Sequence, residues 1–244
     1  MKSVLVTGSN GGIGSAICKA LKQKGYLVIG TDRQRDNNNL DGFVQFDIRD
    51  LVLSETKREE FYMLVNTHIK SSSLFALINN AAVQLLAGLE ELNIEDFKET
   101  IDTNLTAPLC LSKMFYSELK NNKGSIVNIG SIHSKLTKPS FISYATSKSA
   151  LLGLTQSLAV DCGEYIRVNA IQPAATATEM LLDGFKNSPE AFVALKAYHP
   201  TNSIAAPSEI GEAVTFIISE GCQFLNGSVL DINGGIGARL HDPV

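Results

Sequence analysis

A glycine-rich segment near the amino terminus limits the folds open to this chain more than any other feature. Residues 7–14 read TGSNGGIG, between an apolar run at 3–6 that predicts a strand and a helical pattern over 13–24. Glycines let a backbone turn tightly and approach a pyrophosphate, and a helix N-terminus presents unpaired N–H groups. The order of strand, turn and helix therefore predicts a dinucleotide site, although an ordinary connection would use the same order. The residues expected to contact the dinucleotide are Gly8, Asn10, Gly12, Ile13 and Gly14.

Short apolar runs alternate with longer amphipathic segments over the rest of the chain. This alternation predicts an α/β fold: a Rossmann-type, doubly wound, seven-stranded parallel sheet with helices on both faces. No repeat or linker interrupts it, so residues 1–244 are expected to form a single domain. The expected strands are 3–6, 26–30, 43–46, 74–78, 125–129, 166–171 and 228–232. The expected helices are 13–24, 53–70, 94–114, 143–163 and 208–220, with two short helices within 178–197.

Charge and cysteine content exclude several kinds of partner. The net charge is −4 without a cluster of basic residues, whereas a nucleic-acid partner requires a basic face. The four cysteines lie far apart and match no metal-ligand spacing, which predicts reduced thiols and no metal site. The most apolar stretch, 74–89, is broken by amide side chains, and the amino-terminal run is too short for a signal peptide. We therefore expect a cytoplasmic protein without membrane contact.

An acidic residue ends the second expected strand. Asp32 lies 18 residues beyond Gly14, close to the spacing of a carboxylate that binds the ribose of a dinucleotide. A carboxylate there accepts hydrogen bonds from ribose hydroxyls and repels a 2′-phosphate, so NAD is favoured over NADP. Arg33 is the argument for NADP, because an adjacent guanidinium can hold a phosphate. In the simpler alternative, Asp32 only begins the polar loop that follows.

A tyrosine and a lysine stand four residues apart on one expected helix. Tyr144 and Lys148 would share a face of that helix, where the ammonium stabilises a phenolate and lowers the tyrosine pKa. Such a pair can exchange a proton with an oxygen, although most pairs at this spacing are only neighbours on a helix. Ser131 follows the strand at 125–129, at the end of the sheet where ligands bind, and its hydroxyl can bond a carbonyl. The alternative is a serine that only caps a loop.

Taken together, these motifs resemble a typical short-chain dehydrogenase/reductase over almost the whole chain. The tyrosine follows the serine by 13 residues, as that family expects. The matching pieces are TGSNGGIG at 7–14, Asp32, Asp47 in FDI, NNAA at 79–82, Asn104 in TNL, Ser131 in NIGS, YATSK at 144–148, RVNAIQP at 167–173 and the carboxyl-terminal FLNGSVLDINGG.

The resemblance implies a role for each catalytic residue. Tyr144 would exchange a proton with the substrate oxygen, and Ser131 would orient and polarise that oxygen. Lys148 would lower the tyrosine pKa and hold the nicotinamide ribose, and Asn104, in a helix interrupted there, would support a water-linked proton relay to it. The remaining cofactor contacts would be Asp47 and Ile48 beside the adenine, Asn80, Ala81 and Pro173 along the cofactor, and Thr176 and Thr178 near the carboxamide and diphosphate.

The chain departs from the family pattern at three positions. Ala82 and Ala174 stand where glycines are usual, and the added methyl groups narrow the floor near the nicotinamide. We interpret these changes as variation in the substrate pocket or in packing. Ser203 replaces a common arginine, which removes one expected contact that anchors a helix.

The substrate side of the site is less defined by the sequence. The segment of about 176–200, with Met180, should cover the active site, and its apolar residues either line a pocket or pack the segment down. His133 lies in the other substrate loop, between Ser131 and Tyr144, and would meet an anionic or hydroxyl-rich substrate or else remain solvated.

The expected function is an NAD-dependent oxidoreductase that interconverts a small-molecule secondary alcohol and its ketone. A sugar or polyol substrate is preferred because the loop residues are polar. The enzymatic alternative is a 3-oxoacyl-thioester reductase, which usually uses NADPH, and the alternative of another class is a dinucleotide-sensing binding protein. The family also implies a homodimer or homotetramer, formed through helices 94–114 and 143–163 and the last strand.

Overall fold

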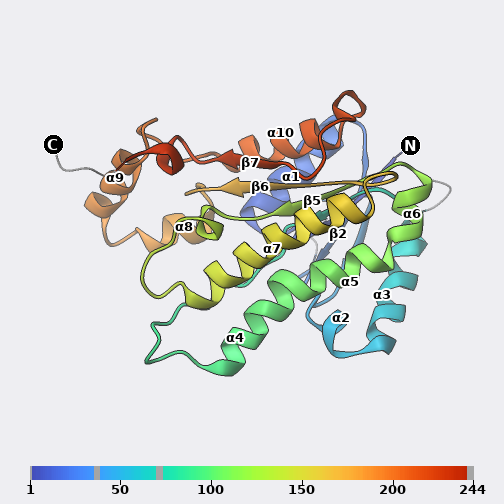
Figure 1. Ribbon diagram of the computed structural model, residues 1–244, viewed down its shortest axis with the longest axis horizontal. Coiled ribbons are helices and arrows are strands. Elements are labelled where there is room, and N and C mark those ends of the chain that lie inside the picture. Colours follow the sequence, from blue (N-terminus) through green and yellow to red (C-terminus); the bar gives the residue numbers. More distant parts are fainter. Residues whose placement is uncertain (1, 36–38, 70–73, 241–244) are drawn as a thin grey trace.

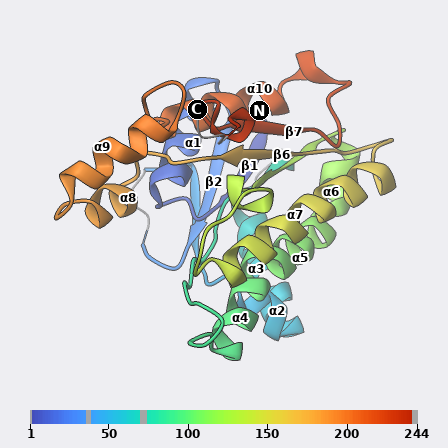
Figure 2. The same cartoon turned by 60° about the vertical axis from the view of Figure 1, so that its left-hand side comes forward.

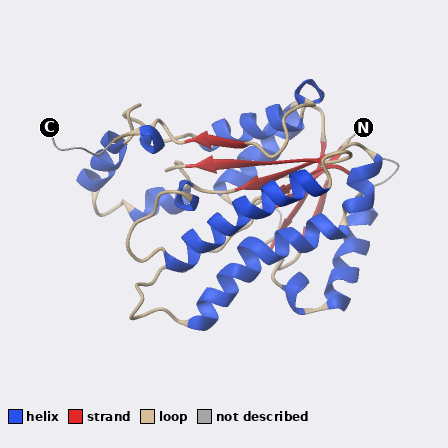
Figure 3. Ribbon diagram, viewed as in Figure 1, coloured by secondary structure: helices blue, strands red, loops and turns tan. Residues whose placement is uncertain are grey.

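The protein is built around a parallel sheet whose strands all point the same way (Figure 3). The computed structural model describes residues 2–35, 39–69 and 74–240. Within these residues the sheet has seven strands in the order β3-β2-β1-β4-β5-β6-β7, and every neighbouring pair is parallel. The predicted sheet is therefore confirmed. The strands are β1 (Ser3–Thr7), β2 (Leu27–Asp32), β3 (Gly42–Gln45), β4 (Leu74–Asn79), β5 (Ser125–Ile129), β6 (Arg167–Pro173) and β7 (Val229–Ile232).

Helices cover both faces of this sheet, as predicted (Figures 1 and 2). On one face, α3, α5 and α7 bury a core that contains Phe61, Leu111 and Phe115. On the other face, α1 and α10 pack together over a second core with Ile17 and Val214. No helix in the described ranges is long and apolar enough to span a bilayer. The helices are α1 (Gly12–Gln23), α2 (Asp50–Leu53), α3 (Glu55–His68), α4 (Ile94–Ile101), α5 (Ala107–Met114), α6 (Tyr116–Asn121), α7 (Ile142–Asp161), α8 (Glu179–Gly184), α9 (Pro189–Tyr198) and α10 (Pro207–Ile218).

Two expected helices are divided in the structure. The helix expected at 53–70 begins earlier as α2, and Ser54 then caps α3 by accepting a hydrogen bond from the Lys57 amide at 3.3 Å. Lys70 lies outside the described residues. The helix expected at 94–114 contains a π-helical segment, Asp102–Thr106, between α4 and α5. Pro108 lies in the first turn of α5, where a proline is favoured because its missing amide hydrogen would have no partner within the helix.

The strand order places the candidate site. It reverses between β1 and β4, so the connections from these two strands run to opposite sides and leave a crevice beyond their carboxyl ends. The glycine turn follows β1, Asp32 ends β2, and Asn80 follows β4. Ser131 follows β5 at the same edge. Residues far apart in the sequence therefore meet at one edge of the sheet.

Candidate active site

A cavity of about 1620 Å³ lies at this edge of the sheet. It is lined by all the residues expected to bind the cofactor and by most of those expected to act in catalysis. Asn104 does not line it, and the side chain of Met180, which stands in α8, lies outside the described part of the chain. The expected residues that line the cavity are Gly8, Asn10, Gly12, Ile13, Gly14, Asp32, Arg33, Asp47, Ile48, Asn80, Ala81, Ser131, His133, Tyr144, Lys148, Pro173, Thr176 and Thr178.

The glycine turn leaves its inner surface free of side chains. Gly8 has a φ of +63°, a conformation that favours glycine. A Cβ atom on Gly14 would lie 2.0 Å from the Gly8 carbonyl oxygen, and one on Gly12 would lie 2.9 Å from Thr178 Cγ2. The N-cap of α1, Gly11, makes no side-chain cap bond, so the amides of the first turn face the cavity without such a partner. This surface suits a pyrophosphate.

Asp32 is held at the end of the cavity expected for the ribose. Its Oδ2 accepts a hydrogen bond from the Asn10 amide and its Oδ1 accepts one from the Gln34 amide, both at 3.2 Å. The Asn10 side chain donates to the Arg35 carbonyl oxygen at 2.7 Å, which ties the glycine turn to the segment after β2. Arg33 is exposed and lines the same end of the cavity. The carboxylate is therefore oriented by backbone amides, whereas the guanidinium lies at the surface.

Asn80 braces the glycine turn. Its Nδ2 donates to the carbonyl oxygens of Thr7 and Gly8, at 2.9 and 3.0 Å. The Thr7 hydroxyl oxygen in turn accepts from the amides of Asn80 and Ala81, each at 3.0 Å. The sequence motif placed Asn80 along the cofactor but did not identify Thr7, whose hydroxyl joins β1 to the segment after β4. Its position directly before the first glycine was the available signal.

Ser131 and Tyr144 form the polar centre of the other half of the cavity. Ser131 Oγ accepts a hydrogen bond from the His133 amide at 3.2 Å. The serine hydroxyl also hydrogen-bonds the Tyr144 phenol, and this bond lowers the phenol pKa. Burial acts in the opposite direction and is the larger effect, so the Tyr144 pKa lies above its ordinary value of 10.0.

Lys148 lies one turn further along α7 and is almost completely buried, with 3% of its surface exposed. Its ammonium donates to the Ile129 carbonyl oxygen at 2.8 Å and lies 5.6 Å from the centre of the Tyr144 ring. Burial lowers the Lys148 pKa to about 8. The sequence led us to expect a tyrosine pKa lowered by this lysine. The chain by itself instead raises the Tyr144 pKa, because desolvation dominates and the lysine faces a carbonyl.

Asn104 lies where the long helix is interrupted, as the sequence led us to expect. Its side chain is fully buried in the π-helical segment, where Oδ1 accepts from the Val83 amide at 2.8 Å. Its Nδ2 donates to the Val83 carbonyl oxygen at 2.9 Å and to Ser147 Oγ at 3.0 Å. These bonds occupy the amide group, so the side chain braces the segment after β4 against α7. The water-linked relay to Lys148 expected from the sequence stays a prediction.

Two of the three departures from the family pattern lie at the cavity. Ala82 and Ala174 both line it, where their methyl groups add apolar surface. Ser203 is exposed, and its hydroxyl donates to Thr201 Oγ1 at 3.2 Å. Arg239, which sequence reasoning missed, donates from Nη1 to the Tyr198 carbonyl oxygen at 3.1 Å, at the end of α9. An arginine from the carboxyl-terminal segment therefore anchors a helix of the covering segment.

Comparison with known proteins agrees with this geometry. Residues 8–237 match a family model described as enoyl-(acyl carrier protein) reductase. The chain is 31% identical to an acetoacetyl-CoA reductase of an Acinetobacter species, over 96% of this chain and 97% of the relative. It resembles the ligand-free aldohexose dehydrogenase of Thermoplasma acidophilum with a TM-score of 0.90 and 25% identity, covering 100% of this chain and 96% of the other. It also resembles ElxO with NADP bound, with a TM-score of 0.87 and 27% identity, covering 98% and 99% of the two chains.

Proposed function

Because this chain belongs to the short-chain dehydrogenase/reductase family of oxidoreductases, which use nicotinamide dinucleotides, we propose that it interconverts a secondary alcohol and a ketone with NAD. One observation carries this proposal. The hydrogen-bonded pair of Ser131 and Tyr144 opens into the same cavity as the glycine turn and Asp32. A group that can transfer a proton and the expected dinucleotide cradle therefore share one cavity.

The chain's own residues supply binding and proton transfer. When bound, the nicotinamide cofactor accepts or supplies the hydride. Ser131 donates a hydrogen bond to the substrate oxygen, and Tyr144 gives a proton to that oxygen in reduction or removes one in oxidation. Lys148, whose pKa of about 8 leaves it partly deprotonated near that pH, exchanges protons with Tyr144. Asn104 and Asn80 hold the backbone around the cavity in place.

NAD is the proposed cofactor because of Asp32. Its two carboxylate oxygens are fixed by backbone amides of the glycine turn and of the segment after β2. A 2′-phosphate placed there would meet a negative charge that cannot turn away without breaking these bonds. Arg33 favours NADP, and a structural relative was solved with NADP, but this guanidinium is exposed and screened by solvent.

For the substrate we propose a sugar or polyol, with a 3-oxoacyl thioester as the second candidate. The fold of an aldohexose dehydrogenase and the polar side chains of the cavity wall, including His133 and Gln84, support the first. The likeness to an acetoacetyl-CoA reductase supports the second. The relatives therefore divide between the two substrates, and the cofactor helps to separate them because thioester reduction usually uses NADPH.

The test is a matrix of both reduced cofactors against ketoses, diketones, steroids and acyl thioesters, followed by absorbance at the nicotinamide band. We expect NADH to be favoured and hydroxylated ketones to be reduced best. A tenfold or larger preference for NADPH would contradict the assignment from Asp32. Binding of NADH without turnover of any compound in the matrix would instead support the dinucleotide-sensing alternative.

Tyr144→Phe tests the proton donor directly. It removes one oxygen and keeps the ring, so we expect turnover to fall by about a hundredfold or more while NADH affinity stays within about threefold. The matched control is Tyr165→Phe, at a half-buried tyrosine that does not line the cavity. Near wild-type turnover in Tyr144→Phe would exclude the proposed role.

The proposed assembly is a homodimer or homotetramer. α5 and α7 expose apolar side chains, Leu109 and Val160, and 88% of Val160 is exposed. Burial of such a patch between copies would remove apolar surface from water. Light scattering coupled to size exclusion checks this, and a monomer at micromolar concentration would contradict it.

A further inference from the structure

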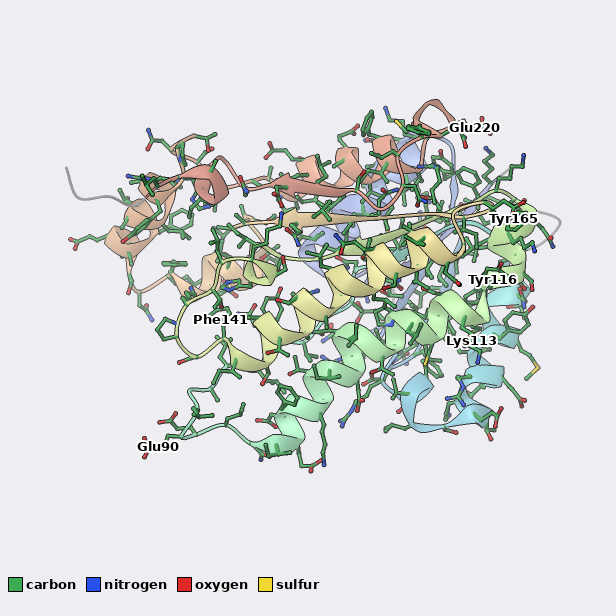
Figure 4. The ribbon with its side chains drawn as sticks, viewed as in Figure 1. Glu90, Lys113, Tyr116, Phe141, Tyr165 and Glu220 are labelled. Atoms are coloured by element: carbon green, nitrogen blue, oxygen red, sulfur yellow. The ribbon has the colours of Figure 1, made fainter. Side chains whose placement is uncertain are left out.

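The imidazole of His133 lies next to the proposed proton donor. Its ring stacks on Phe141, with centres 4.2 Å apart and planes 7° from parallel. It meets the Tyr144 ring edge to face, with centres 5.8 Å apart. Figure 4 shows Phe141 at the start of α7, the end of that helix that lies towards α8 and the covering segment. The imidazole is thus held by two aromatic rings on the substrate side of the cavity.

One ring nitrogen of His133 remains available to a ligand. Nδ1 pairs with Thr137 Oγ1 at 3.1 Å. In the described part of the chain Nε2 has no hydrogen-bond partner, and it is not among the completely buried polar atoms. The residue lines the cavity, so Nε2 can offer one hydrogen bond there. Burial lowers the His133 pKa, and the positive charge of Lys138 acts in the same direction, so the ring is neutral near pH 7.

The imidazole lies close to the two residues that would hold the substrate oxygen. The His133 amide donates to the serine hydroxyl oxygen at 3.2 Å, and the centre of the imidazole lies 5.8 Å from the centre of the Tyr144 ring. A substrate oxygen held by Ser131 and Tyr144 therefore places the neighbouring carbons, rather than a distant group, beside the imidazole. Gln84 and Lys138, two other polar side chains that line the cavity, are exposed.

We propose that His133 is a specificity-determining residue that binds a second substrate oxygen, on the carbon next to the reacting one. The preferred substrates are then α-hydroxy ketones and the corresponding vicinal diols. This inference rests on the proposed function and narrows its sugar or polyol class to substrates that carry a hydroxyl group next to the reacting carbon. A neutral imidazole suits such an oxygen because it can donate to a hydroxyl or accept from it, depending on its tautomer.

The experiment uses matched ketones that differ by one hydroxyl group. The pairs are 2-butanone with 3-hydroxy-2-butanone, and cyclohexanone with 2-hydroxycyclohexanone, each assayed with NADH and NADPH. We expect the wild-type enzyme to favour the hydroxylated member. In His133→Phe, which keeps a flat ring on Phe141 but has no nitrogen, kcat/KM for the hydroxylated ketone should fall about tenfold or more. The value for the plain ketone should stay within about twofold.

A second variant separates hydrogen bonding from packing. His133→Gln loses the ring but keeps a donor and an acceptor, so it should recover part of the preference for the hydroxylated ketone. Equal losses on both members of a pair would overturn the proposal and leave His133 a packing residue, as would an unchanged preference in His133→Phe. If the wild-type enzyme reduces plain and hydroxylated ketones equally, this inference fails and the oxidoreductase assignment stands. If it reduces none of the four with either cofactor, both fail.

Discussion

The two ends of the cavity are built by different means. At the dinucleotide end the surface is backbone: glycines without side chains, amides at the start of α1, and a carboxylate fixed by two more amides. At the catalytic end the surface is side chains: a serine, a tyrosine, a histidine and a buried lysine, each held by contacts from other elements. The first end is specified by the shape of a short segment and the second by tertiary packing.

This difference predicts how each end responds to substitution. A backbone surface cannot give way locally, so an added carbon atom there displaces the whole turn. A surface made of side chains tolerates changes in size, but its buried polar groups lower the stability of the folded chain. Substitutions at the dinucleotide end should therefore lower both cofactor affinity and stability. Substitutions of buried polar groups at the catalytic end should lower activity while raising stability.

The largest effect is expected for Gly14→Ala. The new Cβ would lie 2.0 Å from the Gly8 carbonyl oxygen, so the turn must shift. We expect NADH affinity to fall by about a hundredfold and the stability of the free protein to fall by about 1–3 kcal/mol. Fluorescence titration with NADH and thermal unfolding measure the two quantities.

The matched control for this prediction is Gly153→Ala in α7. No atom lies within 4 Å of its added Cβ, so this change should stabilise the protein by about 0.5–1 kcal/mol without altering NADH affinity. If the NADH affinity of Gly14→Ala stayed within threefold of the wild-type value, the claim that the backbone surface of the dinucleotide end cannot accommodate an added carbon would be wrong.

Asp32→Ala tests the side chain that we propose selects the cofactor at the dinucleotide end. Removal of its charge and acceptors should weaken NADH binding and relieve repulsion of a 2′-phosphate. We expect the NADPH-to-NADH ratio of kcat/KM to rise about tenfold to a hundredfold, which is about 1.4–2.7 kcal/mol. Asp161→Asn, an exposed carboxylate at the end of α7, removes the same charge elsewhere and should leave the ratio unchanged. If Asp32→Ala and Asp161→Asn had the same NADPH-to-NADH ratio of kcat/KM, Asp32 would not select the cofactor.

The smallest effect concerns the buried lysine at the catalytic end. Lys148 binds its proton less tightly in the folded chain, where its pKa is about 8, than in the unfolded chain, where the ordinary value is 10.5. The unfolded chain thus holds more protons between these values, and stability rises with pH through that window. From pH 7 to pH 9 the gain should be about 1 kcal/mol.

Urea unfolding of wild type and Lys148→Met at both pH values measures this gain. The variant lacks the titrating group, so its stability should change less between pH 7 and pH 9 than that of the wild type. If the free energy of unfolding changed equally in the two proteins, burial of the Lys148 amine would not be the source of the pH dependence.

The same contrast explains what could be predicted from the sequence. The turn around Gly8 and Gly14 and the order of strands and helices follow from local patterns, and the structure confirms the parallel sheet with helices on both faces. Ser131, Tyr144 and Lys148 were found because their spacing is local as well, and they do meet in the cavity.

What escaped prediction depends on contacts between distant segments. The bonds of Asn104 to Val83 and Ser147 cross from one helix to another and to the segment after β4. The direction of the Tyr144 pKa depends on how much of the fold surrounds the phenol. Thr7 and Arg239 act through backbone carbonyls and amides, which leave no pattern in the side chains.

The π-helical segment Asp102–Thr106 has a consequence for the geometry of the helices on either side of it. An α-helix advances by about 100° per residue, so one residue more or fewer in this segment rotates everything beyond it by that angle. Leu111 of α5 points into the core, whereas Leu109 is exposed. Deletion of a single residue between Asp102 and Thr106 would turn α5 by about 100°, which moves Leu111 partly out of the core and Leu109 towards it. The wider turn therefore sets the phase between α4 and α5.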